Sequence, residues 1–169
     1  MVTLREAGPG DLEALVEVQR AGAVEALAHI FDQQTHPFPT DQILARWKAH
    51  LVDPVVRAYV VGDPVGHIVG FAATRDDELL HFGTAKDTWG TGVAAAAHDL
   101  VVDRLRAEGL THAWLRVFAE NHQARRFYEK VDWSRTDQLS RSPFAPHPVL
   151  VRYTRAVVDS PSGNRQNSA

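Results

Sequence analysis

The spacing of apolar residues along the chain predicts a strand and two helices in its first third. Residues 2–6 alternate weakly between apolar and polar and predict an opening strand, which Pro9-Gly10-Asp11 ends. Apolar residues then recur at helical spacing to about residue 28, so a helix is predicted with Asp11 as its N-cap. After a proline-bearing loop, Thr40 is the expected cap of a second helix, which Asp53-Pro54 ends.

The remainder of the chain mixes strand patterns with helix patterns. Short turns separate three consecutive strands and imply an antiparallel meander; these strands are predicted over residues 55–61, 65–74 and 78–84. Helices are predicted over residues 91–108 and from Asn121 onward, and strands over residues 111–118, 133–140 and 148–155. This order favours one α/β domain with a mixed sheet over residues 1–157, and the small polar residues 158–169 are predicted to form a disordered tail.

Composition narrows the class of protein. A chain of 169 residues with 44% hydrophobic and 23% charged residues is ordinary for one soluble globular domain. The net charge of -3 gives no reason to expect nucleic-acid binding, and the absence of cysteine excludes a disulfide framework and a thiol nucleophile. Because the N-terminus does not resemble a signal peptide and no apolar run reaches transmembrane length, a cytoplasmic protein without membrane contact is expected.

The chemically distinctive stretch is the glycine-bearing turn Trp89-Gly90-Thr91-Gly92-Val93-Ala94, which lies between a predicted strand and a predicted helix. Small residues let a ligand approach the backbone, and the first amides of a helix lack intrahelical partners, so the turn predicts a phosphate or pyrophosphate site. No lysine follows Gly92 as a P-loop requires, and a dinucleotide fingerprint would need a third glycine. Taken alone, the turn is also consistent with a tight helix cap that binds nothing.

A second motif follows one helix and one strand later, as Asn121-His122-Gln123-Ala124-Arg125-Arg126-Phe127-Tyr128. In this order and context the two motifs resemble the GNAT superfamily of N-acetyltransferases, whose pyrophosphate loop reads Arg/Gln-x-x-Gly-x-Gly/Ala and whose later motif reads Asn-x-x-Ala-x-x-x-Tyr. The close resemblance covers about a third of the chain. Trp89 replaces the usual Arg or Gln, which costs little in a loop that works mainly through backbone amides. Asp132 replaces the usual glycine after the tyrosine helix, so an altered turn is expected there.

The resemblance implies a GNAT-type fold, which is a mixed, mostly antiparallel sheet flanked by helices, with two central strands splayed around the cofactor arm. It implies acetyl-CoA as the cosubstrate and a primary amine of an unidentified small molecule or peptide as the acceptor, in a monomer or homodimer. The amine would attack the thioester directly, Tyr128 would protonate the departing thiolate, and Glu78 would accept the proton of the amine. The residues implied to contact the cofactor are Phe82, Thr84, Trp89, Gly90, Thr91, Gly92, Val93, Ala94, Asn121, Ala124, Arg126 and Phe127.

Each of these roles has a simpler alternative. Tyr128 can be a packing residue on its helix face, and Asn121 can be a plain N-cap. Arg125 can form a surface ion pair with Glu129 instead of reaching a phosphate. For the protein as a whole, the alternative is a GNAT-fold module that binds acyl-CoA as a sensor or interaction partner without turnover.

The general base and the acceptor are the least determined features. His81 or a water chain can take the place of Glu78 as base.

The nine histidines show no metal-ligand spacing, so no metal site is expected, and no Gly-x-Ser-x-Gly elbow supports a serine hydrolase. Acceptor contacts are expected from residues 31–40, from the second helix and from residues 142–147, and the mild acidity would suit a cationic amine.

Overall fold

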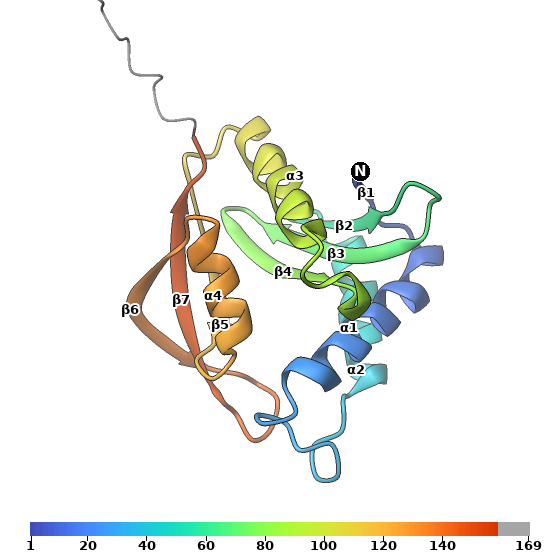
Figure 1. The fold of residues 1–169 in the computed structure, drawn as a ribbon, viewed down its shortest axis with the longest axis vertical. Helices are drawn as coiled ribbons and strands as arrows, with labels where there is room; N and C mark the ends of the chain where they lie inside the picture. Colours follow the sequence, from blue (N-terminus) through green and yellow to red (C-terminus); the bar gives the residue numbers. More distant parts are fainter. Residues whose placement is uncertain (159–169) are drawn as a thin grey trace, which may run out of the picture.

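The computed structural model describes residues 1–158, and one seven-stranded sheet runs through it in the order β1-β2-β3-β4-β5-β7-β6 (Figure 1). The strands are β1 (Thr3–Glu6), β2 (Val56–Gly62), β3 (Ile68–Arg75), β4 (Glu78–Thr84), β5 (His112–Phe118), β6 (Ser134–Arg141) and β7 (Val149–Ala156). The helices are α1 (Leu12–Ala26), α2 (Thr40–Val52), α3 (Val93–Ala107) and α4 (His122–Lys130), with short 3-10 turns η1 (Pro9–Asp11) and η2 (Lys86–Thr88). Only β4 and β5 pair in parallel within this part of the chain, which confirms the predicted mixed, mostly antiparallel sheet. The tail predicted over residues 158–169 lies, beyond Val158, outside the described residues.

Helices cover both faces of the sheet, with α1 and α2 on one face and α3 and α4 on the other (Figure 1). Alternation along β2 separates the two cores. Ala58 and Val60 pack in the core that includes α1 and α2, whereas Tyr59 and Val61 pack in the core that includes α3. Because both faces are buried, this strand is apolar at nearly every position. No described helix is both long and apolar enough to cross a membrane.

The two central strands separate soon after they meet. β4 and β5 pair at one register position, Glu78 with Trp114. Next to this point a β-bulge leaves Leu80 between Leu79 and His81, which pair with successive residues of β3. The splay implied by the family resemblance is therefore present, and it opens the middle of the sheet between α1 and α4.

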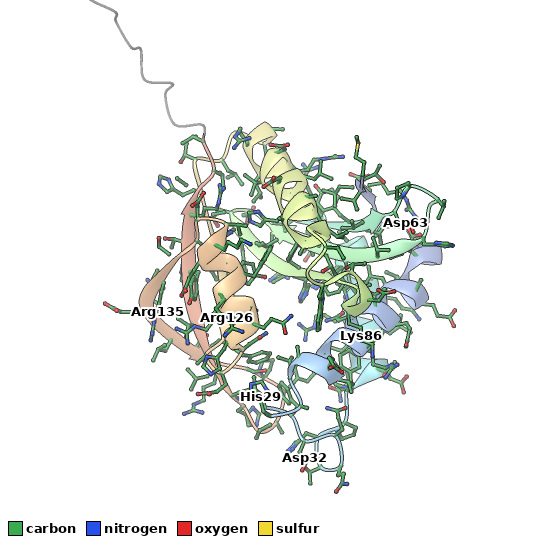
Figure 2. The ribbon with its side chains drawn as sticks, in the orientation of Figure 1. His29, Asp32, Asp63, Lys86, Arg126 and Arg135 are labelled. Atoms are coloured by element: carbon green, nitrogen blue, oxygen red, sulfur yellow. The ribbon has the colours of Figure 1, made fainter. Side chains whose placement is uncertain are left out.

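Beyond the point where β4 and β5 separate, His29 and Phe31, which follow α1, contact the end of β5 and the turn after it. His29, labelled in Figure 2, donates from Nε2 to the carbonyl oxygen of Glu120 at 2.7 Å. The Phe31 ring packs edge-on against Phe118, with centroids 5.4 Å apart. These contacts bound the opening on the side of the β5–α4 turn.

Three local expectations differ from the structure at caps and turns. Asp11 occupies the N-cap position of α1 without capping it, because its carboxylate accepts from the Gly8 amide and from Arg5, each at 2.8 Å. The hydrogen bond from Arg5 is the main cause that lowers the pKa of Asp11 to about 2. Thr40 is the first residue of α2 rather than its cap. Asp132 adopts a positive φ of 74°, so the turn keeps the left-handed backbone that a glycine would take, and the expected alteration is absent.

Candidate functional site

A cavity of about 780 Å³ opens where β4 and β5 separate, and its walls come from α1, β4, β5, α4 and the start of α3. Its lining includes most of the predicted cofactor residues, namely Phe82, Thr84, Trp89, Gly90, Ala94, Asn121, Ala124, Arg126 and Phe127, together with Tyr128. The other three, Thr91, Gly92 and Val93, lie in the same turn but outside the lining. Two motifs that are far apart in the sequence therefore meet at one cavity.

The glycine turn presents unpaired amides at the start of α3. Gly90 and Gly92 have φ values of 79° and 90°, a region that other residues enter only with strain. An added Cβ would meet no atom within 4 Å at either glycine, so the space above the turn is open. The first backbone bond of α3 runs from the Ala96 amide to the Gly92 carbonyl at 3.1 Å, and the preceding amides have no helical partner. Amides left free at a helix N-terminus favour an anion.

Trp89 anchors the turn with its side chain, a role that the sequence did not indicate. Its indole Nε1 donates to the carbonyl oxygen of Thr84 at 3.0 Å, which ties the turn to the end of β4. A Cβ on Gly22 of α1 would lie 3.5 Å from the Trp89 ring, so the helix packs closely under the indole. The tryptophan thus holds both the strand end and α1 against the turn.

Helix α4 brings the second motif to the cavity. Asn121 is both a cap and a lining residue, because its Oδ1 accepts from the Ala124 amide at 3.1 Å. Arg126, labelled in Figure 2, lines the cavity from α4, whereas Arg125 does not line it. Arg125 donates to the Tyr153 hydroxyl at 3.0 Å, and that hydroxyl donates to Glu129 at 2.9 Å. The predicted direct ion pair is therefore replaced by a bridge through Tyr153.

Tyr128 is a packing residue and a cavity residue at once. The side chain is buried, its ring contacts Phe127 and Trp133 edge-on, and it lines the opening. Within residues 1–158 its hydroxyl has no hydrogen-bond partner. Burial raises the pKa of the phenol, so the hydroxyl is protonated at neutral pH and free to donate to a ligand.

The two candidate bases lie toward a second cavity of about 520 Å³. Glu78 lines this second cavity and not the larger one, and it is 7% exposed. Burial raises the pKa of its carboxyl, and the Arg116 guanidinium 3.6 Å away opposes that shift. His81 lines both cavities, and its Nε2 lies 3.0 Å from Nε2 of His50. Burial, with the charge of Arg46 next in size, lowers the pKa of His81 to about 3, so the ring is neutral.

The second cavity is formed by the acceptor segments that the sequence predicted, and it shares a wall with the larger one. Its lining includes residues from 31–39, from the start of α2 and from 142–145. Leu80, His81 and Arg116 line both cavities, so the two spaces adjoin at the β-bulge of β4. The sequence did not indicate four side chains in or beside these cavities: Gln19, Arg46, His50 and Arg116. Of these only His50 had a signal, because it follows Trp47 by three residues on the buried face of α2.

The described residues include no group of three or more histidine or acidic side chains placed to hold a metal ion.

Comparisons with known proteins agree on one family. The family model described as the acetyltransferase (GNAT) family matches residues 23–133. Among solved structures, a GCN5-related N-acetyltransferase from Rhodopseudomonas palustris has a TM-score of 0.76 at 18% identity, over 91% of this chain and 94% of that one. Spermidine N-acetyltransferase from Vibrio cholerae in complex with CoA and spermine has a TM-score of 0.70 at 19% identity, over 92% and 95%. A ribosomal-protein alanine N-acetyltransferase from Escherichia coli has a TM-score of 0.67 at 19% identity, over 96% and 98%. No curated protein matches the sequence.

Proposed function

Because the chain belongs to the acetyltransferase (GNAT) family, we propose that it transfers the acetyl group of acetyl-CoA to a primary amine of a small molecule or peptide. The observation that carries the proposal is the shared cavity of about 780 Å³, which is lined both by Gly90 and Ala94 of the turn at the start of α3 and by Tyr128. An anion site and a proton donor in one cleft match two groups of acyl-CoA, its pyrophosphate and its thioester. Among the solved relatives, one is named for spermidine and another for a ribosomal protein, so the family context leaves the acceptor open.

In the proposed complex, the pyrophosphate accepts hydrogen bonds from the amides of Gly90, Gly92, Val93 and Ala94, whereas the Thr91 amide already donates to the Thr88 carbonyl. The pantetheine arm lies between β4 and β5, where its amides replace the missing strand pairing. Arg126 adds positive charge near the phosphates from α4. Asn121 orders the first turn of α4 and so positions Tyr128.

The transfer step forms one bond and breaks another. The amine nitrogen forms a bond to the thioester carbonyl carbon, and the carbon–sulfur bond then breaks with its electron pair on sulfur. Tyr128 gives its proton to the thiolate and regains one from solvent, while the proton of the amine passes to Glu78, directly or through water. The apolar surroundings that raise the pKa of the phenol also disfavour a charged thiolate and so raise the pKa of the thiol. The pKa values of the proton donor and of the leaving group therefore shift in the same direction.

The test combines binding with turnover. Acetyl-CoA and CoA are expected to raise the melting temperature, because they bind only the native state. Thiol release is then measured with a panel of amines that includes amino acids, polyamines, peptides and amino sugars. Tyr128→Phe keeps the ring, so its acetyl-CoA affinity is expected to be unchanged, while kcat falls by a factor on the order of 10²–10⁴.

Tyr59→Phe is the matched control, because Tyr59 is also buried but does not line the cavity. Acetyl transfer by Tyr128→Phe at the wild-type rate would remove Tyr128 from the mechanism. Tight CoA binding without turnover of any amine would favour the sensor instead.

A further inference from the structure

The second cavity carries an excess of positive charge that the proposed acetyl transfer does not use. Its charged lining residues are two arginines, Arg46 and Arg116, and one carboxylate, Glu78. The imidazole of His81 adds no charge at neutral pH, because burial is the main cause that lowers its pKa to about 3. Arg75 and Arg152, although outside the lining, also act on Glu78 through their charges. The field in the cavity is therefore positive around a single acid.

Arg46 is the unsatisfied member of this group. It projects from α2 and is partly buried, and no carboxylate within the described chain pairs with it. Its guanidinium carbon lies 4.9 Å from the centroid of the Phe144 ring, a cation–π contact that holds the head of the side chain at the cavity. Burial lowers the pKa of Arg46, and the positive charge of Arg116 lowers it further. A guanidinium placed in a cavity next to a like charge is stabilised by an anion, and no carboxylate of residues 1–158 forms an ion pair with Arg46.

Arg116 is also only loosely engaged. Its Nη2 lies 3.6 Å from Glu78 Oε1, beyond hydrogen-bond distance, so its donors remain available to a ligand. It comes from β5, whereas Arg46 comes from α2, and both face the same space of about 520 Å³. Two guanidinium groups on different walls form a clamp suited to one planar or tetrahedral oxyanion.

We propose that the acceptor amine of this enzyme also carries an oxyanion acid group, as an amino acid does, and that Arg46 and Arg116 bind that group. This inference rests on the proposed acetyl transfer and specifies the acceptor. The ammonium group of such a zwitterion lies toward Glu78, whose neighbour Arg116 belongs to the wall shared with the acetyl-CoA cavity. The apolar body contacts the rings of Phe31, Phe38 and Phe144, which also line the space. The ammonium group first passes one proton through Glu78 to solvent, which leaves a neutral amine and an ionised Glu78. The neutral amine then attacks the thioester in the step written above, and Glu78 takes the second proton.

The charge pattern disfavours a polyamine, although the whole protein has a net charge of -3. Two or more ammonium groups in this cavity would meet two guanidinium groups and one carboxylate, so most of the close charge pairs would be repulsive. A carboxylate and a phosphorus acid share the oxyanion chemistry and differ in shape, so both belong in the test.

The test compares amines in matched pairs by thiol release from acetyl-CoA. One arm contains amino carboxylates such as L-phenylalanine, L-methionine and L-glutamate, and a second arm contains aminoalkylphosphonates. Each amino carboxylate is paired with its carboxamide and each phosphonate with its diester, and spermidine stands for the polyamines. The wild type is expected to acetylate an acid at least about tenfold better in kcat/KM than its neutral partner, which is the scale of one charged hydrogen bond.

Variants locate the effect. Arg46→Gln is expected to raise KM for the acid by about tenfold or more, with little change for the neutral partner or for acetyl-CoA, and Arg46→Lys to recover part of the loss. Arg116→Gln is expected to act in the same direction. Arg135→Gln is the control, because Arg135 is exposed on β6, far from α2 in Figure 2. A loss that is equal for acids and neutral partners would show a structural role and overturn the proposal.

The outcome separates this inference from the proposed function. If carboxamides or spermidine are the preferred acceptors, acetyl transfer stands and the acid-binding clamp is wrong. If no amine turns over, the CoA-loaded protein is titrated with N-acetyl amino acids and with their carboxamides. Preferential binding of the acids, lost in Arg46→Gln, would support the clamp even then, and an absence of that preference would overturn it.

Discussion

Acid should destabilise this protein through a buried histidine behind the proposed cofactor cavity. His98 of α3 is fully buried and packs edge-on against the rings of Phe82 and Phe127, two lining residues. Trp133 donates from Nε1 to Nε2 of His98 at 2.8 Å, so the neutral ring carries its proton on Nδ1. That Nδ1 is buried without a hydrogen-bond partner, and Asp99 Oδ1 lies 3.7 Å away, beyond hydrogen-bond distance.

The magnitude follows from the pKa of His98. Burial is the main cause that lowers this pKa from 6.5 to about 4, so the unfolded chain takes up the proton first as the pH falls. Above the pKa that His98 has in the unfolded chain, the neutral imidazole costs the folded state no stability. As the pH falls from there toward the pKa that His98 has in the folded protein, the free energy of unfolding decreases. Between about pH 7 and about pH 4.5 the loss from this one group is about 2 kcal/mol of unfolding free energy.

The assay is urea unfolding of the wild type and of His98→Gln across this pH range. Glutamine offers an oxygen to the Trp133 indole but does not titrate, so the difference between the two unfolding free energies isolates His98. The wild type is expected to lose about 2 kcal/mol relative to the variant on acidification. If the difference in unfolding free energy between the wild type and His98→Gln stays constant over the whole pH range, the conclusion that His98 is buried as a neutral imidazole is wrong.

Three further outcomes are expected. Asp132→Gly removes the strain of a non-glycine residue at a φ of 74°, so it should raise the unfolding free energy by about 1 kcal/mol in urea titrations and leave acetyl-CoA affinity unchanged. Trp89→Phe deletes the bond to the Thr84 carbonyl, and isothermal titration should show weaker acetyl-CoA binding, because the turn is less firmly held. Because burial raises the pKa of Glu78, kcat/KM should fall on acidification through a pKa above the ordinary 4.5, and Glu78→Gln should abolish that limb of the pH profile.

Much of the fold and half of the site could be predicted from the sequence, because interactions between residues close together in the chain determine them. β4 begins and ends at the predicted residues, because turn residues flank its apolar run on both sides. The positive φ of Gly90 and Gly92 and the cap at Asn121 are likewise set by residues within one turn of each other. These elements place the predicted anion site and Tyr128 at one cavity.

What the sequence did not reveal depends on contacts between distant segments. Asp11 failed as a cap because Arg5, on the preceding strand, competes for its carboxylate. The excess charge of the second cavity was hidden for the same reason, since Arg46 and Arg116 are 70 residues apart and line one cavity only in the folded chain. The overall acidity had favoured a cationic acceptor, whereas the local charge of the cavity favours an acid. Net charge describes the whole surface and carries little information about one pocket.

The central claim, that acyl-CoA places its pyrophosphate at the start of α3, is tested most directly by isothermal titration with acetyl-CoA. Ala94 lines the cavity in the first turn of the helix, whereas Ala96 is exposed and lies outside the lining. Ala94→Glu puts a carboxylate where the phosphates are expected, while an acid in the first turn also favours the helix, so the fold should persist. We expect Ala94→Glu to weaken acetyl-CoA binding by about tenfold or more and Ala96→Glu to bind nearly as the wild type. Equal affinity of the two variants, or a wild type that binds no acetyl-CoA, would contradict the account.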